Sequence, residues 1–330
     1  MKPLHPTALP LPISPLALGT WALAGDKFWG PQAEADSIAT IHAALDAGVT
    51  LIDTAPAYGD GLSEQVVGKA LRDHRDRALI ATKISEADMT PEKAVASCEA
   101  SLRRLQTDCI DLLQIHWLGT GEHLEDVIAT MEKLRDAGKV RTLGVCNFGP
   151  QSLGRLRASG HGWITNQLAY NLIWRAIEFE IVGACQRDGL GILCYSPLHQ
   201  GLLTGRFRTA NDVPAGRTRT RHFRADRPMS RHGGAGCEEL TFATIDRIRT
   251  LASRLGQPMA DVALAWLLHR PGVSSVIFGA RTPQQIHANV AAGRLQLDAA
   301  TMAELGRCTD ELKTVLGPSA DMWAGESRIR

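Results

Sequence analysis

Short apolar segments recur along the chain at nearly even intervals, and this repetition limits the possible folds more than any other feature of the sequence. The segments begin at residues 16, 50, 79, 110, 142, 164 and 191, and an eighth begins at residue 275. Each has the length of a strand, and helical patterns lie between them. Strands that alternate with helices indicate a parallel sheet. Eight such units predict an α/β fold, the closed (β/α)8 barrel known as the TIM barrel.

The limits of the predicted elements follow from apolar spacing and from residues that start or stop helices. Thr90, Pro91 and Glu92 suit a helix start, and Gly138 suits a helix end. The long interval before the last strand must hold an insertion, residues 204–237, followed by two helical patterns. Nothing in the chain resembles a linker, so residues 1–330 are predicted to form a single domain. The strands are predicted at 16–20, 50–53, 79–83, 110–115, 142–146, 164–167, 191–195 and 275–278.

A doubly wound sheet with a dinucleotide-binding loop is the alternative α/β arrangement. Gly59 and Gly61 follow an apolar run, but Glu64 stands where the G-x-G-x-x-G pattern needs its third glycine. Because that pattern is incomplete and eight strand–helix units are present, the barrel is the better interpretation.

The composition of the chain excludes several classes of protein. Its 330 residues are 44% hydrophobic and 22% charged, with a net charge of +1. This balance argues against a nucleic-acid or membrane-surface binder, and no apolar run approaches the roughly 20 residues that span a bilayer. The seven cysteines are odd in number and lack C-x-x-C spacing. We therefore expect reduced thiols and a cytoplasmic location.

Polar residues stand at or just after the ends of the predicted strands. In a barrel of this kind the carboxyl ends of all strands meet at one face, where the chemistry takes place. Any one of these residues alone could be a turn residue, but eight around one opening indicate a functional site. They are Thr20, Asp53, Lys83, His116, Asn147, Gln167, Tyr195 and Arg281.

Four residues together suit the reduction of a carbonyl group. Tyrosine is too weak an acid at neutral pH unless its pKa, ordinarily near 10, is tuned. An ammonium group from Lys83 beside Tyr58 would favour the phenolate, and Asp53 would keep that ammonium charged and oriented. His116 could hydrogen-bond a substrate carbonyl or pass a proton. The set predicts a proton donor beside an oxyanion site.

The sequence resembles the aldo-keto reductase superfamily in motifs that cover nearly the whole chain. They are LGTWALAG, AGVTLIDTAPAYGDGLSEQVVGKAL, LIATK, SLRRLQTDCIDLLQIHW, GKVRTLGVCNF, NQLAYN and YSPLHQGLLTGRF. The chain looks most like the bacterial general-stress and inositol-operon-linked reductases. The resemblance implies reversible, NADP(H)-dependent reduction of aldehydes or ketones, with a catalytic tetrad on Asp53, Tyr58, Lys83 and His116.

The resemblance also implies where the cofactor lies. Asn147 and Gln167 would hold the nicotinamide amide, and Tyr195 would stack on its ring. Arg281 suits the 2′-phosphate, because a guanidinium can contact it through two donors. The full cofactor set is Gly19, Thr20, Trp21, Asp53, Asn147, Gln167, Tyr195, Ser196, Pro197, Leu198, Gln200, Gly201, Arg206, Gly279, Ala280, Arg281, Gln285 and Asn289.

A small molecule with a carbonyl or alcohol group is the expected partner. The walls of its binding site are expected to be aromatic. The predicted substrate contacts are Trp21, Trp29, Tyr58, His116 and Trp117. No H-E-x-x-H motif or Cys/His cluster accompanies the histidine, so no metal is predicted.

The insertion is rich in arginine and permits two interpretations. It is either a solvated, mobile loop or a lid over the cofactor phosphates, with Arg206 nearest to them. A nucleic-acid patch is disfavoured because the rest of the chain balances the charge. The arginines are Arg206, Arg208, Arg217, Arg219, Arg221, Arg224, Arg227 and Arg231.

Two other functions stay open at this point. Lys83 could be the Schiff-base nucleophile of an aldolase or lyase, since barrel lysines can form covalent adducts with carbonyls. Alternatively, the protein could be a cofactor-sensing interaction subunit with little turnover.

Overall fold

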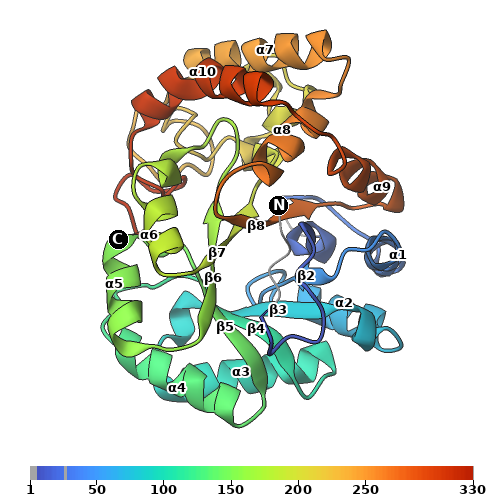
Figure 1. Ribbon diagram of the computed structural model, residues 1–330, viewed down its shortest axis with the longest axis vertical. Coiled ribbons are helices and arrows are strands. Elements are labelled where there is room, and N and C mark those ends of the chain that lie inside the picture. Colours follow the sequence, from blue (N-terminus) through green and yellow to red (C-terminus); the bar gives the residue numbers. More distant parts are fainter. Residues whose placement is uncertain (1–5, 26–27, 330) are drawn as a thin grey trace.

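A closed barrel of eight parallel strands forms the centre of the molecule, which confirms the predicted fold class. The structure is a computed structural model that describes residues 6–25 and 28–329. Strand β1 pairs with β8 to close the barrel, with Gly19 opposite Gly279. Figure 1 shows the strands surrounded by helices. The strands are β1 (Leu16–Gly19), β2 (Leu51–Asp53), β3 (Leu79–Ile84), β4 (Ile110–Ile115), β5 (Val140–Cys146), β6 (Trp163–Ala169), β7 (Gly191–Tyr195) and β8 (Val273–Gly279).

Each predicted strand is present, with ends that differ from the prediction by at most two residues. The observed strands β5, β6 and β8 are longer than predicted, because their outer residues still pair with a neighbouring strand. Apolar runs mark the buried middle of a strand better than its ends.

Helices follow the strands in alternation and cover the barrel. Helix α3 begins at Pro91 as predicted, but Thr90, at the N-cap position, makes no side-chain capping bond. Helices α7 and α10 are additional to the barrel and lie against each other, at the top of Figure 1. The helices are α1 (Glu34–Asp46), α2 (Leu62–Leu71), α3 (Pro91–Leu105), α4 (Leu124–Asp136), α5 (Pro150–Ser159), α6 (Ile181–Arg187), α7 (Glu238–Arg254), α8 (Met259–Leu268), α9 (Pro283–Ala292) and α10 (Ala299–Leu316).

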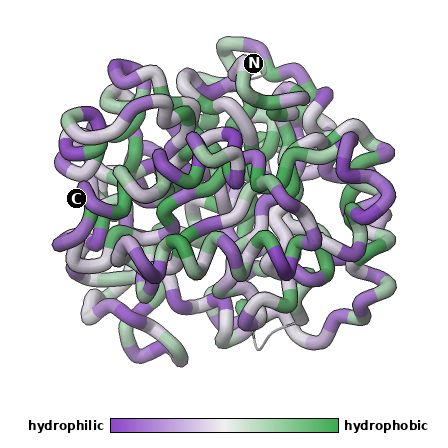
Figure 2. Tube along the Cα trace, turned by 90° about the horizontal axis from the view of Figure 1, so that it is seen from below, coloured by the Kyte–Doolittle hydropathy of each residue, from purple (hydrophilic) through white to green (hydrophobic). Residues whose placement is uncertain are grey.

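Two apolar clusters stabilise this arrangement. The larger lies between the strands and the helices, and the smaller fills the barrel interior. Leu9 and Ile13, from the segment before β1, complete the smaller cluster. Figure 2 shows hydrophobic residues concentrated within the trace and hydrophilic ones mostly around it. The barrel is therefore a packed core, and only the end with the strands' carboxyl termini is available for a site.

The insertion and the segment after α10 lie together. Arg221 of the insertion donates hydrogen bonds to the carbonyls of Leu316 and Ser319, at 2.9 and 3.0 Å. Arg231 forms a β-bridge with Ala324. Within residues 6–25 and 28–329, no helix combines the length and apolarity needed to cross a membrane. The same residues contain no cluster of three or more histidines, cysteines or acids that could hold a metal ion.

Candidate active site

A buried ion pair lies at the carboxyl end of the barrel. The ammonium of Lys83, from β3, donates to Asp53 Oδ1 of β2 at 2.7 Å and to the carbonyl of Thr54 at 2.8 Å. The other carboxylate oxygen, Oδ2, accepts from Gln167 at 2.7 Å and from Gln114 at 3.4 Å. Neighbouring strands thus hold both charges in fixed positions. The backbone carbonyl of Thr54 is a contact that the sequence pattern did not reveal.

Tyr58 lies directly above this pair. The Lys83 ammonium is 5.1 Å from the centre of the Tyr58 ring. Burial raises the pKa of Tyr58 to about 12, although the positive charge of Lys83 acts in the opposite direction. Lys83 therefore acts on this pKa in the expected direction, but desolvation outweighs the ammonium, so the net pKa lies above the ordinary value. Tyr58 is a protonated phenol at neutral pH and can donate its proton.

The charge states of Lys83 and His116 are also fixed by their surroundings. Burial disfavours the ammonium of Lys83, but the Asp53 carboxylate overcomes this and raises the pKa of Lys83 above its usual range. Burial, with a contribution from the Lys83 charge, lowers the pKa of His116 to about 3. The Tyr58 and His116 rings meet edge to face, with centres 6.0 Å apart. A neutral imidazole and a neutral phenol thus stand side by side over a cation.

A buried hydroxyl network supports the pair from inside the barrel wall. The Thr20 hydroxyl donates to the backbone carbonyl of Asp53 at 2.9 Å and lies 2.7 Å from Ser63 Oγ. Thr54 Oγ1 donates to the same serine at 2.9 Å. Thr20 is fully buried and is not among the residues that line the adjoining pocket. Its hydroxyl therefore holds Asp53, and the predicted contact of Thr20 with the cofactor has no support from the lining of the pocket.

A pocket of about 700 Å³ opens above the tetrad. Every residue predicted to contact the cofactor or the substrate lines this pocket, except Thr20. The lining therefore includes three members of the tetrad, Asp53, Tyr58 and His116. Lys83 lies beneath the pocket, with no exposed surface. The positions predicted from separate motifs thus converge on one cavity.

The side of the pocket formed by residues 196–201 has features suited to a phosphate-bearing cofactor. Ser196, His199 and Gln200 have positive φ angles of 52°, 45° and 53°, a strained conformation typical of functional sites. The buried Nε2 of Gln200 and Nε of Arg217 have no hydrogen-bond partner among the described residues. Buried donors of this kind are costly unless an acceptor binds them. Phosphate oxygens are suitable acceptors, so these residues fit NADP(H).

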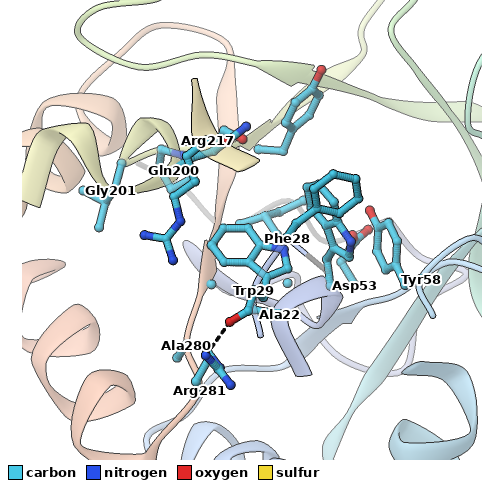
Figure 3. A pocket seen from close by; sticks show the side chains of 18 of the residues that line it. Ala22, Phe28, Trp29, Asp53, Tyr58, Gln200, Gly201, Arg217, Ala280 and Arg281 are labelled. Carbon is cyan, nitrogen blue, oxygen red and sulfur yellow. Dashed lines mark hydrogen bonds between the residues drawn. The ribbon is translucent and has the colours of Figure 1, made fainter. Parts of the chain in front are cut away.

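Arg281 lies at the far end of the same wall, just after β8. Its side chain donates to the Trp29 carbonyl at 2.7 Å, to Gln32 Oε1 at 2.8 Å and to the Pro31 carbonyl. Figure 3 shows the bond to Trp29 and the ring of Trp29 between Phe28 and Arg281. The guanidinium therefore joins β8 to the loop after β1, a contact that the sequence did not predict.

The three residues expected around the nicotinamide are hydrogen-bonded to the protein. Tyr195 donates from its hydroxyl to Asn147 Oδ1 at 3.0 Å, and Asn147 Nδ2 donates to the carbonyl of His116 at 3.1 Å. Gln167 donates to Asp53. Asn147 adopts a positive φ of 60°, which aims its side chain across the strand ends. These contacts link the expected nicotinamide residues directly to the tetrad.

Aromatic rings and arginines form the mouth of the pocket. Trp21 stacks on Tyr58, with ring centres 5.9 Å apart. Arg219 of the insertion lies 5.3 Å from the Trp21 ring and 4.6 Å from the Trp323 ring. The sequence pattern gives no sign that Phe28, Trp323 and Arg328 line the pocket, because they stand in aperiodic segments away from any strand end. The many arginines of the insertion were the one sequence feature that indicated a positively charged surface at the mouth of the pocket.

Comparison with known proteins gives a consistent result. A family model described as the aldo/keto reductase family matches residues 15–310. The chain is 36% identical over 288 residues to aldo-keto reductase YhdN of Bacillus subtilis, with 83% of each chain covered. It is 30% identical over 325 residues to the NADH-specific methylglyoxal reductase of Escherichia coli, with 90% of this chain and 96% of that protein covered.

Solved structures show the same similarity. The glycerol dehydrogenase of Gluconobacter oxydans superposes with a TM-score of 0.80 at 32% identity, with 96% of each chain covered. An aldo/keto reductase of Klebsiella pneumoniae, solved with NADP and acetate, has a TM-score of 0.71 at 30% identity. That match covers 90% of this chain and 91% of the other.

Proposed function

The chain belongs to the aldo/keto reductase family and is an NADP(H)-dependent oxidoreductase of carbonyl groups, and we propose that Asp53, Tyr58, Lys83 and His116 carry out its reaction. The observation that carries the proposal is the fully buried Lys83–Asp53 pair directly beneath Tyr58. A buried ion pair is expensive unless its geometry is used. Here it supplies a fixed positive charge under the phenol.

Each residue has a role that follows from its protonation state. NADPH, when bound, supplies a hydride to the carbonyl carbon. Tyr58 donates its proton to the carbonyl oxygen, and Lys83 stabilises the phenolate that remains. His116 is neutral, so it orients the carbonyl by a hydrogen bond and adds no charge. Asp53 keeps Lys83 charged and in place.

We propose further that the cofactor is preferentially NADPH. Arg281, with Gln285 and Asn289 on α9, lines the end of the pocket opposite the tetrad. A guanidinium suits a 2′-phosphate, which NADH lacks. One relative is named NADH-specific and one structural neighbour was solved with NADP, so the family name alone does not decide the preference. It rests on Arg281.

The Schiff-base alternative has less support. A nucleophilic lysine must be a free amine that reaches its substrate. Lys83 is held as an ammonium by Asp53 and does not line the pocket. A cofactor-sensing subunit would keep the same cofactor contacts and differ only in turnover.

The proposed function is tested by following NADPH oxidation with methylglyoxal, the substrate in the name of one relative, and with other small aldehydes. We expect one alcohol formed per NADPH oxidised, and slower turnover with NADH at equal concentration. A covalent adduct trapped on Lys83 by borohydride would instead support the lyase. Tight NADPH binding with no turnover on any carbonyl would support the sensing subunit.

The insertion and the segment after α10 both line the same pocket as the barrel strands. This supports the further proposal that residues 1–330 form one domain.

A further inference from the structure

The charges around the pocket are strongly one-sided. Among the residues that the structure describes, one carboxylate, that of Asp53, lines the pocket, and it is already paired with Lys83. The other charged side chains that line the pocket are positive. Such a pocket attracts anions, since water screens charges poorly in a cleft. The described arginines in the lining are Arg206, Arg217, Arg219, Arg231, Arg281 and Arg328.

Three of these arginines lie along the predicted path of the cofactor. The guanidinium of Arg206 packs against Gly201, where a Cβ atom would come within 2.6 Å of it. Arg217 lies 5.1 Å from the centre of the Trp29 ring, and Arg281 donates to the backbone carbonyl of the same tryptophan, as Figure 3 shows. The pyrophosphate and the 2′-phosphate of NADP(H) account for positive charge on this side.

The cofactor does not account for two arginines at the other end. The Cζ atom of Arg328 lies 3.9 Å from the centre of the Trp117 ring, and Trp117 follows His116 in the chain. Arg219 lies on Trp21, which in turn stacks on Tyr58. Both positive groups therefore border the space next to the proton donor.

Arg328 is held in one orientation by a buried partner. Its Nε and Nη2 donate to the two carboxylate oxygens of Asp321, at 2.7 and 3.2 Å. Asp321 is itself fully buried and also accepts from the backbone of Trp323 at 3.0 Å. The remaining nitrogen, Nη1, makes no hydrogen bond with any described residue. A fixed guanidinium with an unused edge on a pocket wall suits a carboxylate ligand.

We propose that this end of the pocket is an anion subsite and that the substrate is an oxo-acid, a carbonyl compound with a carboxylate. Arg328 contacts the carboxylate through Nη1, and Arg219 adds a second positive charge across the mouth. The Trp117 and Trp21 rings hold the two guanidinium groups and enclose the carbon skeleton between them. The inference rests on the proposed function, because it places the carbonyl at Tyr58.

A matched set of aldehydes tests the subsite. 4-Formylbenzoate and its methyl ester share the ring and the reacting group and differ in charge, and 4-formylphenyl phosphate tests a phosphate at the same position. With NADPH we expect the kcat/KM of the acid to exceed that of the ester roughly tenfold or more, as for a charged hydrogen bond. Equal values for acid and ester, or a higher value for the phosphate, would overturn the proposal.

Variants connect the preference to Arg328. The double variant Arg328→Gln with Asp321→Asn removes both charges, so that no buried carboxylate is left alone. We expect the ratio of the kcat/KM of the acid to that of the ester to fall to about one. Arg224→Gln is the matched control, because Arg224 is exposed in the insertion, pairs with Asp226 and does not line the pocket. A preference that survives in the double variant would overturn the assignment.

A binding measurement separates this inference from the proposed function. Benzoate has no carbonyl to reduce, and its binding to the NADP⁺-loaded protein can be followed by tryptophan fluorescence. We expect the Kd to rise roughly tenfold in the double variant. If benzoate binds in this way but no aldehyde is reduced, the proposed function fails and the subsite stands. If aldehydes are reduced but benzoate does not bind, the subsite fails.

Discussion

The strand ends and the mouth of the pocket are built in different ways. At the strand ends, Lys83 is held by hydrogen bonds of 2.7 and 2.8 Å to Asp53 and Thr54, on a neighbouring strand and just after it. At the mouth, Arg219 lies between aromatic rings at 4.2 to 5.3 Å. Short hydrogen bonds fix both distance and direction, whereas contacts with ring faces tolerate displacement. The strand ends thus suit the common reaction of the family, and the mouth suits the choice of ligand.

Removing the proton donor should have the largest effect. We expect Tyr58→Phe to lower the rate of carbonyl reduction by a factor of about 10² to 10⁴, since only the general acid is lost. NADPH affinity, measured by fluorescence titration, should stay unchanged. Single-turnover kinetics measure the rate, and Trp323→Phe at the mouth is the comparison, with a far smaller loss. Near-normal turnover in Tyr58→Phe would contradict the assignment of this residue.

The buried ion pair should dominate stability at the strand ends. Asp53→Asn leaves the Lys83 ammonium without its counter-charge, so we expect a loss of about 3–5 kcal/mol in the free energy of unfolding. Urea denaturation measures it. The control is Lys69→Met, which removes an exposed pair with Glu34 of similar length, 2.8 Å, and should cost less than about 1 kcal/mol. Equal losses in the free energy of unfolding would show that the buried Asp53–Lys83 pair matters no more for stability than the exposed Lys69–Glu34 pair.

Acid should weaken the anchoring of the insertion before it affects the tetrad. His222 donates to the carbonyl of Ile173 at 2.8 Å, and burial lowers its pKa to about 4. Between about pH 6.5 and pH 4 the unfolded chain binds more protons than the folded one, so stability falls as the pH falls. His222 alone should contribute a loss on the order of 3 kcal/mol over this window, and buried His116 and His199, whose pKa values are also lowered, add to the fall.

Urea denaturation at several pH values, together with proteolysis of the insertion, checks this expectation. His222→Gln keeps a donor and removes the titrating group, so its stability should depend less on pH. An identical slope for this variant and the unaltered protein would exclude His222 as the cause.

The cofactor end of the pocket should show a smaller, selective effect. We expect Arg281→Ala to weaken NADPH binding by about 1.5–3 kcal/mol, roughly tenfold or more, because a charged contact with the 2′-phosphate is lost. NADH binding should change much less. Gln32→Ala removes one protein partner of Arg281 and controls for displacement of the loop. Equal losses for the two cofactors would show that Arg281 does not recognise the phosphate.

The sequence predicted the barrel and its tetrad for the same physical reason. Apolar runs must be buried, and a parallel barrel brings their carboxyl ends together, so that Asp53 and Lys83 become neighbours. The contacts of Arg281 with Trp29 and of Arg328 with Asp321 could not be predicted, because they join aperiodic segments. The net pKa of Tyr58 was also beyond sequence reasoning, since burial and the Lys83 charge oppose each other and only the three-dimensional arrangement decides which is larger.

The pairing of β1 with β8 has a consequence for the way the protein reaches its active state. Gly19 and Gly279 lie side by side although most of the chain separates them, and the bond from Arg281 to Trp29 joins the segments that follow these two strands. Contacts between such distant parts of a chain form late and slowly in folding. The full cofactor-binding wall is therefore absent from a partly folded chain. Cofactor in excess would stabilise only molecules whose barrel has closed, so its binding reports on completed folding.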